Sequence, residues 1–298
     1  MAIVDYETFL VLPTEDVAKL VRAAGPQVCV FVINGTRRWF TLEHADVKQN
    51  SFQDYLDITG ERYIDLYQLC FEHGMDTLLA PVVRTESLTR GSEYVQKVMV
   101  DALAEFAKNP DYLSFYEKYK VSVHFYGDYR KFFPGTPFAY LTELFDDITK
   151  QTEQNTSCRL FYGIFASDAT DTIAELSVEH FQKTGNIPSR RELVEQYYGE
   201  YIAPVTLYVN FDKFRVFDYP LLNLGDEDLY FTVAPSPYMT QEQWRNILYD
   251  HIYSRCVEEV DYSKMQKQDF QDMKDFYRIN CQNTLGVGEM RGGIWYPK

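Results

Sequence analysis

The chain has 298 residues, of which 46% are hydrophobic and 24% charged, a composition typical of a globular protein with a sizeable buried core. Its 44 acidic and 29 basic side chains give a net charge of −15. A negative electrostatic field around the whole protein disfavours non-specific binding of nucleic acid or anionic membranes. The sequence contains no apolar run near the roughly 18 residues of a membrane span and no signal-peptide pattern at its start. We therefore expect a cytoplasmic protein without an integral membrane segment.

The cysteines are five in number, widely spaced and without a CxxC pair, which predicts neither a disulfide framework nor a zinc site but buried small side chains. They are Cys29, Cys70, Cys158, Cys256 and Cys281.

Strand and helix patterns alternate along the first half of the chain. The β-branched run 27–33 predicts a buried strand that ends at Asn34-Gly35, and helical spacing over 54–72 stops at the C-cap signature His73-Gly74. The alternation continues with strands over 76–83, 121–127 and 159–165, each followed by a helix, starting near Gly91, Ala139 and Asp168.

The second half adds a capping box, Ser189 with Glu192, that begins a helix before a strand over 204–211. A helix from Gln241, a polar helix and an irregular tail over 286–298 follow. Without a linker or a repeat, this pattern predicts a single α/β domain over 1–298 with a central, mostly parallel sheet flanked by helices, and a C-terminal helical extension from about residue 260.

The loop after the first strand carries the strongest chemical signal. Gly35 and Thr36 let backbone N–H groups approach an anion, and Arg37 and Arg38 supply forked, charged donors that match phosphate oxygens. Ligands of parallel sheets bind at the carboxyl ends of strands, so the loop is a candidate diphosphate site rather than a surface turn with solvated arginines.

Other features carry less weight. The loop after the second strand could bring Arg84 or Arg90 to the same carboxyl end of the sheet. The pair Asp146-Asp147 resembles the start of an aspartate-rich metal motif, but the third carboxylate of that motif is missing, so a solvated helix face is expected there. The histidines show no metal-binding spacing, so we expect structural roles for them.

The loop Asn34-Gly35-Thr36-Arg37-Arg38-Trp39-Phe40 resembles the diphosphate-binding loop of the cis-prenyltransferases. It is most similar to a branch of terpene synthases with that fold, of the tuberculosinol and kolavelool synthase type, which do not elongate prenyl chains. The similar blocks run over nearly the whole chain: 35–40, 71–74, 125–129, 188–192, 198–201, 229–236, 247–253 and 286–288.

One departure concerns the segment that grips isopentenyl diphosphate in the elongating enzymes, where arginines, a serine and a glutamate are expected. The matching segment here, 210–218, retains only Arg215, and Phe217 stands at the serine position. The resemblance therefore implies a site for one prenyl diphosphate and a small acceptor, with Arg90 and Arg215 as weaker candidates for diphosphate binding.

A second departure is Asn34, where the resemblance places an aspartate. An amide can serve neither as a carboxylate base nor as a carboxylate metal ligand, yet it is nearly isosteric and still forms hydrogen bonds. The resemblance also implies a catalytic tyrosine, which counting back from Phe71-Glu72-His73-Gly74 places at Tyr55.

The resemblance implies a Mg²⁺-dependent, homodimeric diterpene synthase. It would ionise a bicyclic diterpenyl diphosphate of kolavenyl or tuberculosinyl type and quench the cation with water to an alcohol such as kolavelool or tuberculosinol. Three alternatives stay open at this point: prenyl transfer to a nucleoside such as adenosine, chain elongation with isopentenyl diphosphate, and a non-catalytic partner subunit, which the Asn34 departure favours.

Overall fold

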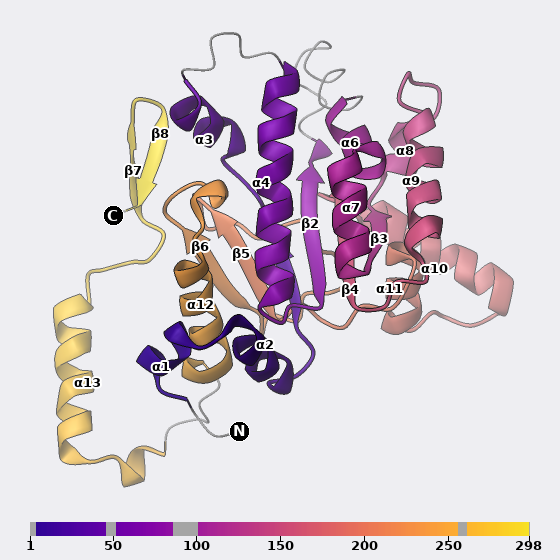
Figure 1. The fold of residues 1–298 in the computed structure, drawn as a ribbon. Coiled ribbons are helices and arrows are strands. Elements are labelled where there is room, and N and C mark those ends of the chain that lie inside the picture. The colour runs from indigo at the N-terminus through magenta and orange to yellow at the C-terminus, as the bar shows by residue number, and fades with distance from the viewer. Residues whose placement is uncertain (1–3, 46–51, 86–100, 256–260, 298) are drawn as a thin grey trace.

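The computed structural model of the chain describes residues 4–45, 52–85, 101–255 and 261–297. Its centre is a six-stranded sheet in the order β3-β4-β2-β1-β5-β6, in which every neighbouring pair is parallel (Figure 1). The strands are β1 Val28–Phe31, β2 Thr77–Val83, β3 Val121–Tyr126, β4 Cys158–Ile164, β5 Leu207–Phe211 and β6 Asp228–Thr232. The predicted α/β fold with a parallel sheet is confirmed.

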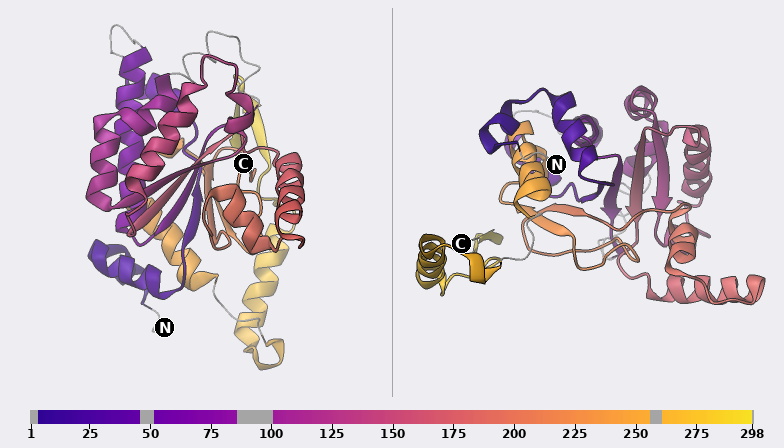
Figure 2. Two further views of the ribbon diagram at one scale, coloured as in Figure 1. Left: turned by 90° about the vertical axis from the view of Figure 1, so that its right-hand side faces the viewer. Right: turned by 90° about the horizontal axis from the view of Figure 1, so that it is seen from below.

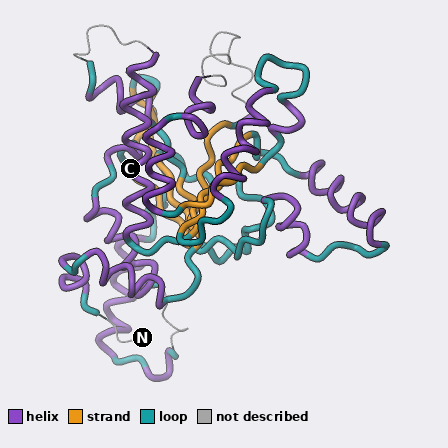
Figure 3. The backbone as a smooth tube through the Cα atoms, turned by 45° about the vertical axis from the view of Figure 1, so that its right-hand side comes forward, coloured by secondary structure: helices purple, strands orange, loops and turns teal. Residues whose placement is uncertain are grey.

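Most of the described helices lie around this sheet (Figure 3). They are α1 Tyr6–Val11, α2 Thr14–Ala23, α3 Thr36–Glu43, α4 Phe52–Glu72, α6 Leu103–Lys108, α7 Pro110–Tyr119, α8 Tyr129–Phe132, α9 Tyr140–Thr152, α10 Thr170–Thr184, α11 Arg190–Tyr198, α12 Gln241–Tyr249 and α13 Lys267–Asn280, with short turns at Ser236–Tyr238 (η3), Asp250–Ser254 (η4) and Tyr262–Lys264 (η5). Within the described ranges, no helix is both long and apolar enough to span a bilayer.

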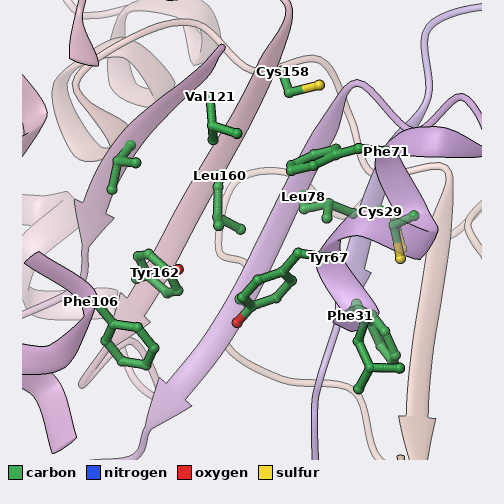
Figure 4. Close-up of a cluster of buried hydrophobic side chains, with 14 of the residues drawn as sticks. Cys29, Phe31, Tyr67, Phe71, Leu78, Phe106, Val121, Cys158, Leu160 and Tyr162 are labelled. Atoms are coloured by element: carbon green, nitrogen blue, oxygen red, sulfur yellow. The ribbon is translucent and has the colours of Figure 1, made fainter. Parts of the chain in front are cut away.

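One face of the sheet carries most of the aromatic core. Tyr67 from α4 and Phe106 from α6 lie over Tyr162 of β4, with ring centroids 6.1 Å and 4.3 Å from it (Figure 4). Alternate strand residues point to opposite faces, so Cys29 and Phe31 join this core while Val30 joins a smaller one under α11. The high aromatic content is thus largely a packed core.

The structure agrees with most of the predicted elements. Helix α4 covers the predicted 54–72, and Ser189 and Glu192 form the complete capping box of α11. Cys29, Cys70 and Cys158 are buried, but Cys281 is exposed, which corrects the expectation for that residue, and Cys256 lies outside the described residues. The helix expected near Gly91 also begins outside them.

Several elements were not predicted from the sequence. Helix α1 has only six residues and β6 is an edge strand that is only partly buried, so neither has a strong periodic pattern. Helix α2 is amphipathic, with Val17, Ala18 and Val21 on its buried face, so the sequence did contain a helical signal there that the prediction missed. The tail expected to be irregular instead forms an antiparallel hairpin, β7 Gly288–Arg291 with β8 Ile294–Pro297. Its turn is Gly292-Gly293, both with positive φ, a two-residue hairpin signal that the tail contained.

The C-terminal region lies to one side of the sheet. Helix α13 has no buried residue and runs apart from the main body, on the side opposite to α10 (Figure 2). The hairpin that follows returns to lie beside α3 (Figure 1). This return brings the end of the chain to the carboxyl end of the sheet.

Candidate functional site

The loop between β1 and α3 is held in place by a residue far along the chain. The Asn34 N–H donates to Ser236 Oγ at 3.0 Å, and the Ser236 N–H donates to the Asn34 carbonyl at 3.0 Å. Ser236 Oγ also donates to the Val32 carbonyl at 3.1 Å. The two-way pairing fixes the backbone path at the point where the strand ends.

Asn34 is exposed, and its side chain is nevertheless ordered by the loop. Its Oδ1 accepts the Gly35 N–H at 2.8 Å. A carboxylate at this position would have an oxygen in the same place, so the aspartate expected here from the resemblance would accept the same bond.

Gly35 cannot be replaced without moving its neighbours. Its φ is +78°, and a Cβ on it would lie 2.8 Å from the Phe211 ring and from Pro235. The missing side chain lets β1, β5 and the segment before η3 converge here. Close backbone approach of this kind is what an anion-binding loop needs.

Helix α3 begins directly at this loop. Gly35 is its N-cap and offers no side chain to cap the helix, and the first-turn N–H groups of a helix have no intrahelical acceptor. Thr36 Oγ1 lies 3.0 Å from the hydroxyl of Tyr63 on α4, which orients the two helices. The result is a positive helix end at the carboxyl edge of the sheet.

A cavity of about 350 Å³ opens beside α3, between α4, α6, α7 and the end of β2. Its described lining is mostly apolar and aromatic: Arg37, Phe52, Tyr55, Leu56, Thr59, Gly60, Tyr63, Val82, Val83, Ala102, Leu103, Glu105, Phe106, Asn109 and Tyr112. Both Arg37 and Tyr55, predicted from the sequence, line this cavity. Its size is in the usual range of small-molecule sites.

The walls of the cavity are ordered by ring contacts. The ring of Tyr55 packs edge-on against that of Phe40, with ring centroids 5.1 Å apart, and its centroid lies 6.0 Å from that of Phe52. Burial, reinforced by the neighbouring tyrosines, raises the pKa of Tyr112 well above its usual value, so this phenol stays neutral. The cavity thus presents uncharged rings along most of its length.

Two positions modify this apolar lining. Gly60, inside α4, faces Tyr112, whose ring would be 3.6 Å from an added Cβ, so any larger side chain would take volume from the cavity. Glu105 contributes a carboxylate, which accepts a hydrogen bond from Asn109 Nδ2 at 2.7 Å. Sequence reasoning missed both, because nothing in the local pattern places α6 and α7 opposite α4.

Arg38 lines a different cavity from Arg37. Its guanidinium lies 5.2 Å from the centre of the Phe211 ring and borders a second space of about 300 Å³. The described lining of this second cavity is Arg38, Leu42, Asp212, Thr232, Val233, Pro235, Ile294, Trp295, Tyr296 and Pro297.

The other predicted arginines lie elsewhere. Arg215 is exposed, and its backbone carbonyl accepts the Tyr208 hydroxyl at 2.9 Å. Arg84 is 3.7 Å from a carboxylate oxygen of Asp218 and 4.5 Å from the Phe217 ring centre, and Arg90 lies outside the described residues. The described geometry therefore does not bring Arg215 or Arg84 into the lining of the first cavity.

A metal ion would find few protein ligands here. Across the described residues there is no group of three or more His, Cys, Asp and Glu side chains able to hold one. Mg²⁺ often binds through one or two carboxylates together with substrate phosphates and waters. Asn34 offers a neutral amide oxygen in place of a carboxylate, and this oxygen has a second lone pair beside the one used by Gly35, so it would be a weaker ligand of the same kind.

Comparison with known proteins gives a full-length similarity, although no family model matches. The chain is 40% identical over 300 residues to tuberculosinyl adenosine transferase of Mycobacterium tuberculosis, covering 100% of both chains. It is 22% identical over 280 residues to (+)-kolavelool synthase of Herpetosiphon aurantiacus, covering 93% of this chain and 91% of the other.

Solved structures support the same fold. A probable undecaprenyl diphosphate synthase from Campylobacter jejuni matches with a TM-score of 0.55 at 15% identity, covering 79% of this chain and 98% of the other. Lavandulyl diphosphate synthase from Lavandula x intermedia, in complex with dimethylallyl diphosphate, matches with a TM-score of 0.54 at 12% identity, covering 80% and 98%. The resemblance to cis-prenyltransferases is confirmed at the level of fold.

Proposed function

Because the chain belongs to the tuberculosinyl adenosine transferase family of cis-prenyltransferase-fold enzymes, we propose that it ionises a bicyclic diterpenyl diphosphate of kolavenyl or tuberculosinyl type. The observation that carries the proposal is the aromatic cavity of about 350 Å³ with Arg37 in its lining and the start of α3 beside it. A hydrocarbon fits the cavity, and a diphosphate fits the positive helix end.

The diphosphate is bound by Gly35, Thr36, Arg37 and Arg38. First-turn N–H groups and forked guanidinium donors stabilise the charge that develops on the leaving oxygen as the allylic C–O bond breaks. Asn34 Oδ1 would hold a Mg²⁺ ion bound with the diphosphate as a neutral oxygen ligand, and that ion would supply further neutralisation of the leaving group.

The remaining carbocation lies among the rings of the cavity. Each aromatic face contributes roughly 0.5–2 kcal/mol to holding a cation without reacting with it. Tyr55, in the lining and braced by Phe40 and Phe52, is placed to orient a small acceptor at the cation.

Water as the acceptor gives a diterpene alcohol such as kolavelool or tuberculosinol. A nucleoside such as adenosine is the second candidate acceptor, and the full-length 40% identity to a tuberculosinyl adenosine transferase favours it. Both reactions share the ionisation step and differ only in what captures the cation.

The test is incubation of the purified chain with Mg²⁺ and farnesyl, geranylgeranyl or bicyclic diterpenyl diphosphate, with and without adenosine. We expect diphosphate release only from the bicyclic substrates, with an alcohol detected by gas chromatography or an adenosine adduct by mass spectrometry. Longer prenyl products from labelled isopentenyl diphosphate would revive chain elongation. Failure to consume any prenyl diphosphate, combined with binding to a catalytic homologue, would favour the partner-subunit alternative.

A further inference from the structure

The second cavity is bordered by the same helix turn as the first. Arg37 lines one cavity and Arg38 the other, and consecutive residues of a helix point about 100° apart. The first turn of α3 therefore lies between the two spaces. A diphosphate bound at this turn would have the aromatic cavity on one side and the second cavity on the other.

The C-terminal hairpin forms one wall of the second cavity, and it is packed in a defined way. A Cβ on Gly288 of β7 would lie 2.3 Å from the indole of Trp295, so the indole rests directly on the β7 backbone. A Cβ on Gly286 would lie 3.1 Å from the ring of Phe214. The ring centroids of Phe214 and of Phe231 on β6 are 4.6 Å apart. The first contact packs the hairpin on itself, and the second holds the segment just before it against the loop after β5 and, through Phe231, against the edge strand β6.

The lining of this cavity combines flat rings with a few charged groups. Trp295 and Tyr296 both border it, although as consecutive strand residues they point to opposite faces of β8, while Arg38 supplies N–H donors and Asp212 a carboxylate acceptor. Asp212 has a φ of +75°, a left-handed backbone conformation that Asp adopts more readily than most residues. A flat heteroaromatic molecule that carries N–H or O–H donors matches this set, because rings stack on it and the carboxylate accepts its hydrogen bonds.

We propose that this second cavity binds the acceptor nucleoside, with Trp295, whose indole is held on the β7 backbone, stacking on its base. The proposal rests on the prenyl transfer to a nucleoside given as the second candidate under the proposed function. It assigns acceptor recognition to the C-terminal hairpin and Asp212, separate from the prenyl cavity, with Arg38 placed between the acceptor and the diphosphate that it also binds.

The transfer balances without a general base. The lone pair of a ring nitrogen of the base forms the new C–N bond to the allylic carbon, and the electron pair of the broken C–O bond leaves with the diphosphate. The product carries one positive charge on the base, and no proton has to be removed. Asn34, which cannot act as a carboxylate base, is compatible with this step, and the rings and Asp212 stabilise the positive product.

The test measures the binding of adenosine and the use of prenyl diphosphate separately. Adenosine affinity is measured by calorimetry in the presence of inorganic pyrophosphate and Mg²⁺, and KM values for both substrates are measured in the transfer reaction. Trp295→Ala and Tyr296→Ala are compared with Tyr262→Ala, an exposed aromatic residue outside both cavities. Circular dichroism verifies that each variant is folded.

We expect Trp295→Ala to weaken adenosine binding on the order of 5- to 150-fold, the range of one lost stacking contact. Tyr262→Ala should match the unmodified chain, and Arg37→Ala should raise the KM for prenyl diphosphate instead. Equal adenosine affinity in the Trp295 and Tyr296 variants and the control overturns the proposal, and so does a chain that releases diphosphate but does not bind adenosine. Adenosine binding that depends on Trp295, without any release of diphosphate from a prenyl substrate, would support this nucleoside site and refute the proposed function.

Discussion

Asn34→Asp tests whether the missing carboxylate limits the capture of the cation by water. The Asn34 amide oxygen accepts the Gly35 N–H at 2.8 Å, and the backbone of the residue is fixed by Ser236. An aspartate oxygen accepts the same bond in the same place, so the loop geometry is preserved. A change in rate then reports charge and basicity rather than misfolding.

Two effects of the substitution oppose each other. A positioned general base contributes roughly 10²- to 10⁴-fold to a reaction that removes a proton. The new negative charge repels the diphosphate, but Asn34 is exposed, and two unit charges about 4 Å apart in water interact by only about 1 kcal/mol, or about fivefold. The base effect is larger, so we expect alcohol formation to rise by at least roughly 20-fold.

The assay is gas chromatography of extracted products from a bicyclic diterpenyl diphosphate with Mg²⁺, at matched enzyme concentration and with Asn34→Ala as the control that removes the Gly35 hydrogen bond. Adenosine transfer by a ring nitrogen needs no base, so its rate should change by no more than about the fivefold electrostatic effect. An Asn34→Asp variant that forms alcohol no faster than the unmodified chain would refute the reasoning and leave Tyr55 or the diphosphate as the proton acceptor.

Four further predictions concern single sites. Arg37→Ala should weaken binding of a prenyl diphosphate by about 1.5–3 kcal/mol, the loss of a charged hydrogen bond, whereas unchanged affinity in calorimetry would remove the loop from the site. Tyr55→Phe keeps the ring and loses the hydroxyl, so it should lower turnover while leaving the KM for prenyl diphosphate nearly unchanged; an unaltered turnover would reduce Tyr55 to packing. Burial lowers the pKa of His73, whose Nε2 accepts a hydrogen bond from Arg245 Nε. The unfolded state therefore binds more protons than the folded state at acid pH, and the free energy of unfolding should fall as the pH drops below about 6.5. The urea midpoints at pH 5 and pH 7 should differ less in His73→Gln than in the unmodified chain. Light scattering at micromolar concentration should give a homodimer, and Phe276→Ser on the exposed α13 should weaken it; a monomeric unmodified chain contradicts this prediction.

Local patterns in the sequence were sufficient for much of the framework. β-branched runs followed by helical spacing predicted β1, α4, β2, β3 and β4, because burial on a sheet and on a helix face imposes different periods. The same reasoning placed the Gly35–Arg38 loop at the carboxyl end of a strand, where the structure has it.

Features that depend on distant parts of the chain were decided by the tertiary structure alone. Ser236 holds Asn34 across 202 positions of sequence, and the hairpin at 288–297 returns to Arg38. The sequence predicted that Arg37 and Arg38 bind one diphosphate together. It could not show that helix geometry turns the two side chains toward different cavities, one walled by α7 and the other by β8. Local periodicity records which face of an element is buried, but which elements meet at that face is set by the packing of the whole chain.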